Sequence, residues 1–166
     1  MKIAISGTQG TGKSTMVLEL ASYYKKKFKN KKIHIIQENV INCPLSFNEK
    51  TSFKSQMWII SSTIKAEIEA ETKYDIIVCD RSVFDPIAYL MACEMPHVSS
   101  IFYDFLKHYG RTYDKIYLMD GNNNTFVFDN GFRNTDEKFR TKVDECFKEI
   151  FNKLNDDNYL NSLEII

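Results

Sequence analysis

The stretch Gly7-Thr8-Gln9-Gly10-Thr11-Gly12-Lys13-Ser14 decides how the rest of this sequence is interpreted. It fits the pattern G-x-x-x-x-G-K-[ST] without a mismatch. An apolar run, Ile3-Ala4-Ile5, precedes it, and a helix-like stretch from Thr15 to Leu20 follows it. Because the pattern is informative only between a strand and a helix, these flanks favour a phosphate-binding loop over a glycine-rich turn that matches by chance.

The residue types in this loop explain its chemistry. Glycines have no Cβ, so the backbone curls and its N–H groups face a bound phosphate at the positive end of the next helix. We expect Lys13 to reach the β- and γ-phosphates of ATP, and the Ser14 hydroxyl to ligate Mg²⁺. The predicted nucleotide-binding residues are Gly7, Thr8, Gln9, Gly10, Thr11, Gly12, Lys13, Ser14 and Thr15.

The bulk composition bounds the class of protein. A chain of 166 residues predicts one domain, residues 1–166. The 22 basic and 22 acidic residues balance, so nucleic acid is not an expected partner. The densest basic patch, lysines within residues 25–32, is interpreted as a solvated helix end, with a nucleic-acid or membrane contact as the alternative.

The cysteines and the apolar runs indicate the compartment. The four cysteines form no C-x-x-C pair and do not cluster with the three histidines, which argues against a zinc site or a disulfide framework. No apolar stretch approaches the ~20 residues that span a bilayer. With no secretion signal in view, we expect a cytoplasmic protein without a membrane partner.

Apolar β-type runs alternate with longer helical patterns along the chain. Nearly continuous apolar runs are typical of parallel strands that are covered on both faces. The alternation predicts an α/β three-layer sandwich with a five-stranded parallel sheet, the fold of P-loop NTPases. Strands are expected at residues 2–6, 33–37, 75–80, 115–119 and 163–166, and helices at residues 12–28, 51–73, 86–92, 98–109 and 137–154.

The third predicted strand ends in Asp80, which has the form of a Walker B carboxylate and is expected to reach Mg²⁺ beside Ser14. Arg81 follows and is predicted to hold a phosphoryl group or the ribose side of an acceptor, with a structural ion pair as the alternative. Ser82 is interpreted as a turn residue. Asp85 before Pro86 is interpreted as a helix N-cap.

Here the sequence resembles known families. The segment Asp80-Arg81-Ser82-Val83-Phe84-Asp85 resembles the D/E-R-S motif of deoxynucleoside kinases and of the ribosylnicotinamide-kinase-like ATP-binding domains associated with NadR. Residues 53–56 resemble the substrate-side helix of deoxynucleoside kinases, which implies that Gln56 hydrogen-bonds a nucleobase. Residues 129–133 and Arg140 are similar to the lid segment of the NadR-like group. The resemblance implies a nucleoside- or nucleotide-kinase-like fold.

The combined motifs predict Mg²⁺- and ATP-dependent phosphoryl transfer to a small nucleoside- or nucleotide-like acceptor. Residues 121–140 are the candidate lid, whose Arg133 and Arg140 are expected to close over the developing charge; an ordinary charged helix start is the alternative. Glu38, at the end of the second strand, is the candidate general base, and a solvated strand-end glutamate is the alternative.

Other interpretations stay open. Trp58, Phe53, Phe84 and Tyr89 form either an aromatic wall of the acceptor site or part of the core. The chain is alternatively an ATP-binding regulatory module without kinase activity, or a polynucleotide 5′-end kinase, which requires a basic groove. A GTPase is disfavoured because no N-K-x-D motif occurs, and an AAA-type motor because the chain is short. A homodimer is left open.

Overall fold

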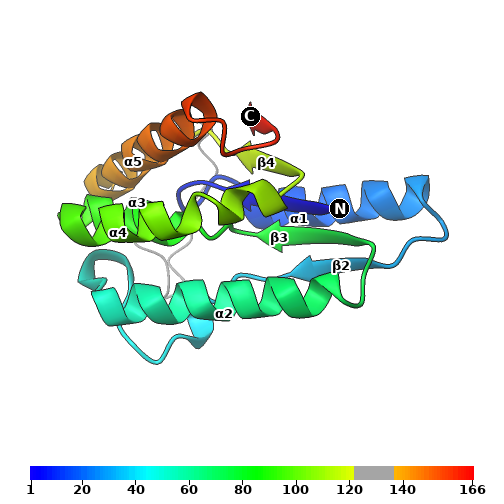
Figure 1. Cartoon of the computed structure of the whole chain (residues 1–166), viewed down its shortest axis with the longest axis horizontal. Coiled ribbons are helices and arrows are strands. Elements are labelled where there is room, and N and C mark those ends of the chain that lie inside the picture. Colours follow the sequence, from blue (N-terminus) through cyan, green and yellow to red (C-terminus); the bar gives the residue numbers. More distant parts are fainter. Residues whose placement is uncertain (122–136) are drawn as a thin grey trace.

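A computed structural model describes residues 1–121 and 137–166 of the chain. The described part contains a five-stranded parallel sheet in the order β2-β3-β1-β4-β5 (Figure 1). The strands are β1 (Lys2–Ser6), β2 (Ile33–Ile36), β3 (Ile76–Asp80), β4 (Lys115–Leu118) and β5 (Leu163–Ile165). The helices are α1 (Lys13–Lys27), α2 (Phe53–Glu71), α3 (Asp85–Ala92), α4 (Pro96–Leu106) and α5 (Glu137–Asp156), with the 3₁₀ turns η1 (Val40–Asn42), η2 (Asn48–Lys50) and η3 (Tyr109–Thr112). The predicted fold class is confirmed.

The two faces of the sheet are covered unequally. Successive residues of a strand point to opposite faces. Ile5 and Val78 therefore face α1, where they pack with Val17. Their neighbours Ala4 and Cys79 face a larger core that α2, α3, α4 and α5 build together. Because both faces are buried, β1 and β3 tolerate the near-continuous apolar runs from which they were predicted.

Several predicted element ends are wrong by one to three residues, and the local chemistry explains two of the errors at helix starts. The fourth helix begins at Pro96 rather than at residue 98, because proline lacks an N–H and is tolerated in a first helical turn. The second helix begins at Phe53 rather than at residue 51, because Ser52 caps it by accepting a hydrogen bond from the Ser55 backbone N–H. The interpretation of Asp85 as an N-cap is also wrong: Phe84 is the N-cap, and Asp85 is the first residue of α3.

Parallel strands of this kind end at one edge of the sheet. The loops after β1, β2 and β3 therefore lie together, on the left-hand side of Figure 1. Within the described residues, no helix combines the length and the apolar character needed to cross a membrane.

Candidate nucleotide and acceptor site

The phosphate-loop motif connects β1 to α1, as predicted. Gly7, Gly10 and Gly12 have φ angles of 134°, 80° and 85°, a region that side chains disfavour. At Gly7 there is also no room, because a Cβ would lie 2.9 Å from the Met119 carbonyl oxygen. The Thr11 hydroxyl donates to the Thr8 carbonyl oxygen at 2.9 Å, which closes the loop on itself. The three glycines are therefore required by backbone geometry.

Lys13 lies inside the loop rather than in solvent. Its side chain donates to the same Thr8 carbonyl oxygen, and the residue is only 6 % exposed. Burial, with the positive charge of Arg81 nearby, lowers the pKa of Lys13 to about 7. Three carboxylates, those of Glu38, Asp85 and Asp80, oppose this lowering only in part, so a bound phosphate would add the negative charge that favours the protonated amine.

The structure brings the two predicted metal ligands together. The Ser14 hydroxyl donates to Asp80 Oδ2 at 2.7 Å. Asp80 Oδ1 is buried and has no hydrogen-bond partner among the described residues, and burial raises the pKa of this carboxyl. A hydroxyl beside an orphaned carboxylate oxygen fits Mg²⁺, which takes oxygen ligands and retains phosphate and water ligands of its own. Both residues therefore suit a metal at the phosphate loop.

Arg81, the first residue after β3, has an unusual backbone conformation. Its φ is 93°, which is strained for a residue other than glycine. Its guanidinium donates through Nε to Glu38 and through Nη1 to Asp85 Oδ1 at 3.0 Å. The ion pair that was the alternative interpretation of Arg81 is therefore present, and it involves the candidate general base.

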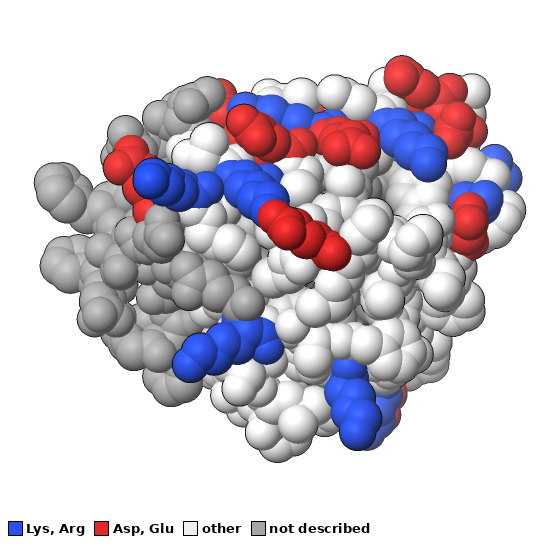
Figure 2. All heavy atoms as spheres, turned by 90° about the vertical axis from the view of Figure 1, so that its left-hand side faces the viewer, with Lys and Arg blue, Asp and Glu red and all other residues white. Residues whose placement is uncertain are grey.

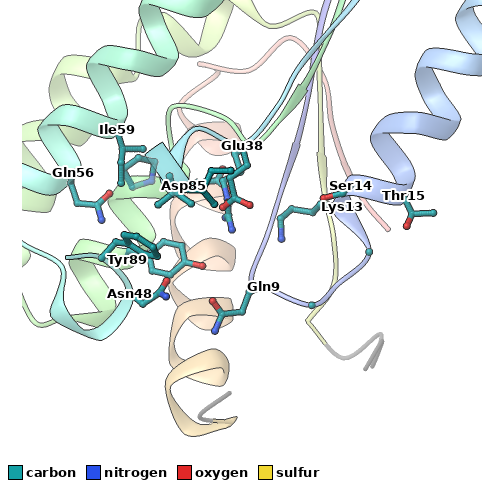
Figure 3. Close-up of a pocket in the computed structure, with 17 residues that line it drawn as sticks. Gln9, Lys13, Ser14, Thr15, Glu38, Asn48, Gln56, Ile59, Asp85 and Tyr89 are labelled. Atoms are coloured by element: carbon teal, nitrogen blue, oxygen red, sulfur yellow. The ribbon is translucent and has the colours of Figure 1, made fainter. Parts of the chain in front are cut away.

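Residues predicted for the phosphate donor and residues predicted for the acceptor line one cavity of about 350 Å³. Figure 3 shows Lys13, Ser14 and Thr15 on one side, Gln56, Asn48 and Tyr89 on the other, and Glu38 and Asp85 between them. The predicted site residues that line this cavity are Gln9, Gly10, Gly12, Lys13, Ser14, Thr15, Glu38, Gln56 and Arg81.

The remaining predicted residues lie elsewhere. Gly7, Thr8 and Thr11 shape the loop without lining the cavity, and Asp80 reaches it only through Ser14. Arg140 lies in the first turn of α5, half-buried, with no partner for its buried Nε among the described residues. Arg133, and all of the candidate lid from 122 to 136, falls outside the described residues.

Of the two interpretations left open for the four aromatics, the core position fits Phe84, and the wall of the cavity fits Tyr89. Phe84 is fully buried in the core, and Phe53 is 48 % exposed. Trp58 is half-buried and does not line the cavity. Of the four aromatics only Tyr89 lines it, and Phe47, which was not predicted, joins it there. Spacing along a helix does not separate an aromatic that faces the core from one that faces a ligand cavity.

Two further residues of the site were missed. Asp85 lines the cavity and pairs with Arg81; its place four residues after an arginine in the chain was the available signal. Asn48 lines the cavity with a φ of 60°, and its carbonyl oxygen accepts a hydrogen bond from the Cys93 thiol at 3.3 Å. No sequence pattern predicts this position of Asn48, because it depends on the path of the long connection between β2 and α2.

Charges on this face of the molecule are mixed. Figure 2 shows the side on which the strands end, with basic and acidic side chains interleaved around a largely uncharged surface. The described atoms on this face form no continuous basic groove, which a polynucleotide-binding site would require.

Comparison with known proteins agrees with this geometry. Residues 2–159 match the model of a family described as AAA domain, so the chain belongs to that family of P-loop proteins.

Solved structures show the same fold. Deoxyadenosine kinase from M. mycoides with bound dATP matches at a TM-score of 0.68 and 20 % identity, over 100 % of this chain and 90 % of that one. Thymidylate kinase from Ehrlichia chaffeensis matches with a TM-score of 0.68 and 17 % sequence identity, over 100 % of this chain and 86 % of that one. Thymidylate kinase from Candida albicans matches with a TM-score of 0.68 and 18 % sequence identity, over 99 % of this chain and 82 % of that one. No curated protein sequence matches the chain significantly. The fold is that of P-loop nucleoside and nucleotide kinases.

Proposed function

We propose that this protein transfers the γ-phosphoryl group of Mg²⁺-bound ATP to a hydroxyl group of a small nucleoside-like acceptor. One observation carries the proposal: the phosphate-loop lysine and a carboxylate–arginine pair line a single cavity of about 350 Å³. Phosphoryl transfer needs mainly positioning and charge neutralisation, which such an arrangement supplies.

Each residue has a role in this proposal. The loop amides and Lys13 bind the triphosphate, while Ser14 and Asp80 hold Mg²⁺, which neutralises phosphate charge when it is bound. Glu38 accepts the proton of the acceptor hydroxyl, and its contact with Arg81 fixes where that carboxylate lies.

The acceptor end of the cavity combines apolar and amide groups. Gln56 is buried, and its Nε2 donates to Thr51 Oγ1 at 2.8 Å, which fixes its amide in a cavity that Tyr89 and Phe47 also line. A planar ring with hydrogen-bonding groups at its edge fits such a wall, because the rings contact its faces and an amide both donates and accepts.

The charges favour a hydroxyl acceptor over a monophosphate. Among the described residues that line the cavity, the cations are Lys13, on the donor side, and Arg81, which is already paired with Glu38 and Asp85. The acceptor side therefore carries a net negative charge, and a phosphate dianion placed there is repelled. This supports a neutral or cationic acceptor, such as a nucleoside or ribosylnicotinamide, as the NadR-like resemblance implies.

Several finer points belong to the same proposal. Residues 121–140 act as the lid, with Arg133 and Arg140 stabilising the developing charge on the transferred group. The chain acts as one P-loop kinase-like domain, residues 1–166, in the cytoplasm.

The test is transfer of labelled phosphate from ATP to a panel of nucleosides, ribosylnicotinamide and nucleoside monophosphates. We expect transfer to at least one unphosphorylated acceptor, and a loss of about 10²–10⁴-fold in rate with unchanged ATP affinity for Glu38→Gln. Lys13→Ala is the matched donor-side variant and should abolish transfer. ATP binding without transfer to any acceptor contradicts the proposal and favours a regulatory ATP-binding module.

A further inference from the structure

We infer that Asp85 is a positioning residue for this site: it holds Arg81 in the one orientation in which Arg81 contacts Glu38. The inference rests on the proposed function for its kinetic consequence. Its structural part, that the position of the Arg81 guanidinium depends on Asp85, can be measured without any enzymatic turnover.

The contacts of Asp85 are divided between its two carboxylate oxygens. Oδ1 accepts from Arg81 Nη1 at 3.0 Å. Oδ2 accepts from the Ser6 hydroxyl at 2.7 Å, from the Ser82 hydroxyl at 2.9 Å and from the Ser82 backbone N–H at 3.0 Å. One oxygen is thus anchored by three donors, and the other is left to orient the arginine.

Burial makes this anchoring strong. Asp85, Ser6 and Ser82 are 1 %, 0 % and 1 % exposed, so water does not compete for their hydrogen bonds. If the buried carboxylate moved, its donors would lose their hydrogen-bond partner. Leaving a buried donor unsatisfied costs more free energy than a formed hydrogen bond contributes to stability. The carboxylate is therefore held in one position, and its contact with Arg81 restricts the position of the guanidinium.

Arg81 needs such a partner because its backbone does not by itself determine where the long side chain lies. With φ at 93°, the chain turns sharply after β3, and the backbone N–H of Arg81 donates to the Ile5 carbonyl oxygen at 3.0 Å. The guanidinium then lies near the Gly7 carbonyl oxygen, 3.5 Å from Nη1, and 5.8 Å from the centre of the Tyr89 ring. Asp85 supplies the charged contact that selects this position.

The same carboxylate links the acceptor side to the phosphate loop. Ser6 is the last residue of β1 and directly precedes Gly7, while Ser82 follows Arg81. Their hydroxyl oxygens lie 2.7 Å apart and both donate to Asp85. Asp85 thereby fixes the arginine relative to the loop that binds the donor, at the first turn of α3.

The experiment compares Asp85→Asn, Arg81→Lys and the double variant, with Glu67→Gln as a matched buried-carboxylate control at the opposite end of the sheet. Asp85→Asn should lower kcat/KM for the acceptor by about 10²-fold, because misplacement of about 1 Å has effects of that size. Its affinity for Mg²⁺-ATP should stay within about twofold. The double variant should be no slower than Arg81→Lys alone, since Asp85 acts through Arg81. Glu67→Gln should lower Tm without changing kcat/KM.

The structural part is tested by NMR of the arginine Nε–H groups in the full chain. Arg81 should give a slowly exchanging signal, assigned by its loss in Arg81→Lys, and this signal should disappear or shift in Asp85→Asn and persist in Glu67→Gln. An unchanged signal in Asp85→Asn overturns the inference whether or not the protein has kinase activity. Additive kinetic effects in the double variant overturn it as well.

Discussion

The Ser14 hydroxyl donates to Asp80 Oδ2 at 2.7 Å, although the two residues are 66 positions apart in the chain. Their contact follows from strand order. β3 pairs directly with β1, with Asp80 in register with Ile5, so the end of β3 reaches the start of α1. A hydroxyl and a carboxylate, which are oxygen ligands of the kind that would suit Mg²⁺, therefore meet beside the phosphate loop.

Removing the Asp80 charge should weaken the metal-dependent part of nucleotide binding. For Asp80→Asn we expect Mg²⁺-ATP affinity to fall about tenfold or more, roughly 1.4 kcal/mol, while affinity for ATP with a chelator present stays the same. Calorimetric titration with and without Mg²⁺ measures both. Asp104→Asn, an exposed acid on α4, is the control and should behave like the parent protein. If Asp80→Asn lowered ATP affinity equally with and without Mg²⁺, Asp80 would not be a metal ligand.

Nucleotide binding should take up a proton at Lys13. Burial lowers the pKa of Lys13 to about 7, so this side chain is largely neutral in the unliganded protein above that pH, and a bound phosphate restores its charge. Proton uptake on binding Mg²⁺-ATP should rise from near zero at pH 6 to about one at pH 8.5. Calorimetry in two buffers of different ionisation enthalpy measures it. If uptake does not change with pH, Lys13 is already charged before nucleotide binds.

A buried ion pair far from the site should dominate stability at the other end of the sheet. Lys2 Nζ lies 2.9 Å from Glu67 Oε2, with side-chain exposures of 3 % and 0 %, and Tyr109 and Tyr113 also donate to Glu67. Lys2→Met leaves that carboxylate without its cation and should lower the free energy of unfolding by about 3 kcal/mol. Urea denaturation measures it, with the exposed Lys65→Met as control.

The same variant predicts a pH dependence. Burial raises the pKa of Glu67, and loss of Lys2 removes the charge that opposes this rise. A carboxyl whose pKa is higher in the folded chain binds protons more readily there, so folding gains stability as pH falls. The destabilisation by Lys2→Met should therefore shrink between pH 7 and pH 5. A loss that grows on acidification contradicts this assignment.

Two loop glycines should differ in how much they tolerate alanine. At Gly7 a Cβ meets the Met119 carbonyl oxygen at 2.9 Å and φ is 134°, whereas at Gly12 the nearest atom is 4.0 Å away and φ is 85°. Gly7→Ala should lower Tm clearly more than Gly12→Ala, because it adds a backbone clash to the strain of about 1 kcal/mol that both share. Thermal unfolding without nucleotide checks the order. Equal shifts would show that Met119 moves aside at little cost.

Much of the fold was predictable because its signals are local. The loop motif, the apolar runs of β1 and β3 and the helical spacing of α5 each lie within a short window, so the elements were predicted with small errors at their ends. The candidate site was harder. Gln56 and Tyr89 both line the cavity, but the sequence left Tyr89 grouped with Phe84, which is buried in the core, and Phe53, which is half exposed.

The sequence by itself determined the phosphate loop, since three glycines with positive φ and a following lysine and serine have a local reason to occur together. Only the tertiary structure decided what Asp80, Arg81 and Asp85 do. Read along the chain, they are a strand end, a turn and a helix start. Strand order brings Asp80 to Ser14, and burial beside Ser6 turns Asp85 from an apparent helix cap into the partner of Arg81. Contacts between distant segments depend on how the sheet is assembled, and no local spacing encodes that assembly.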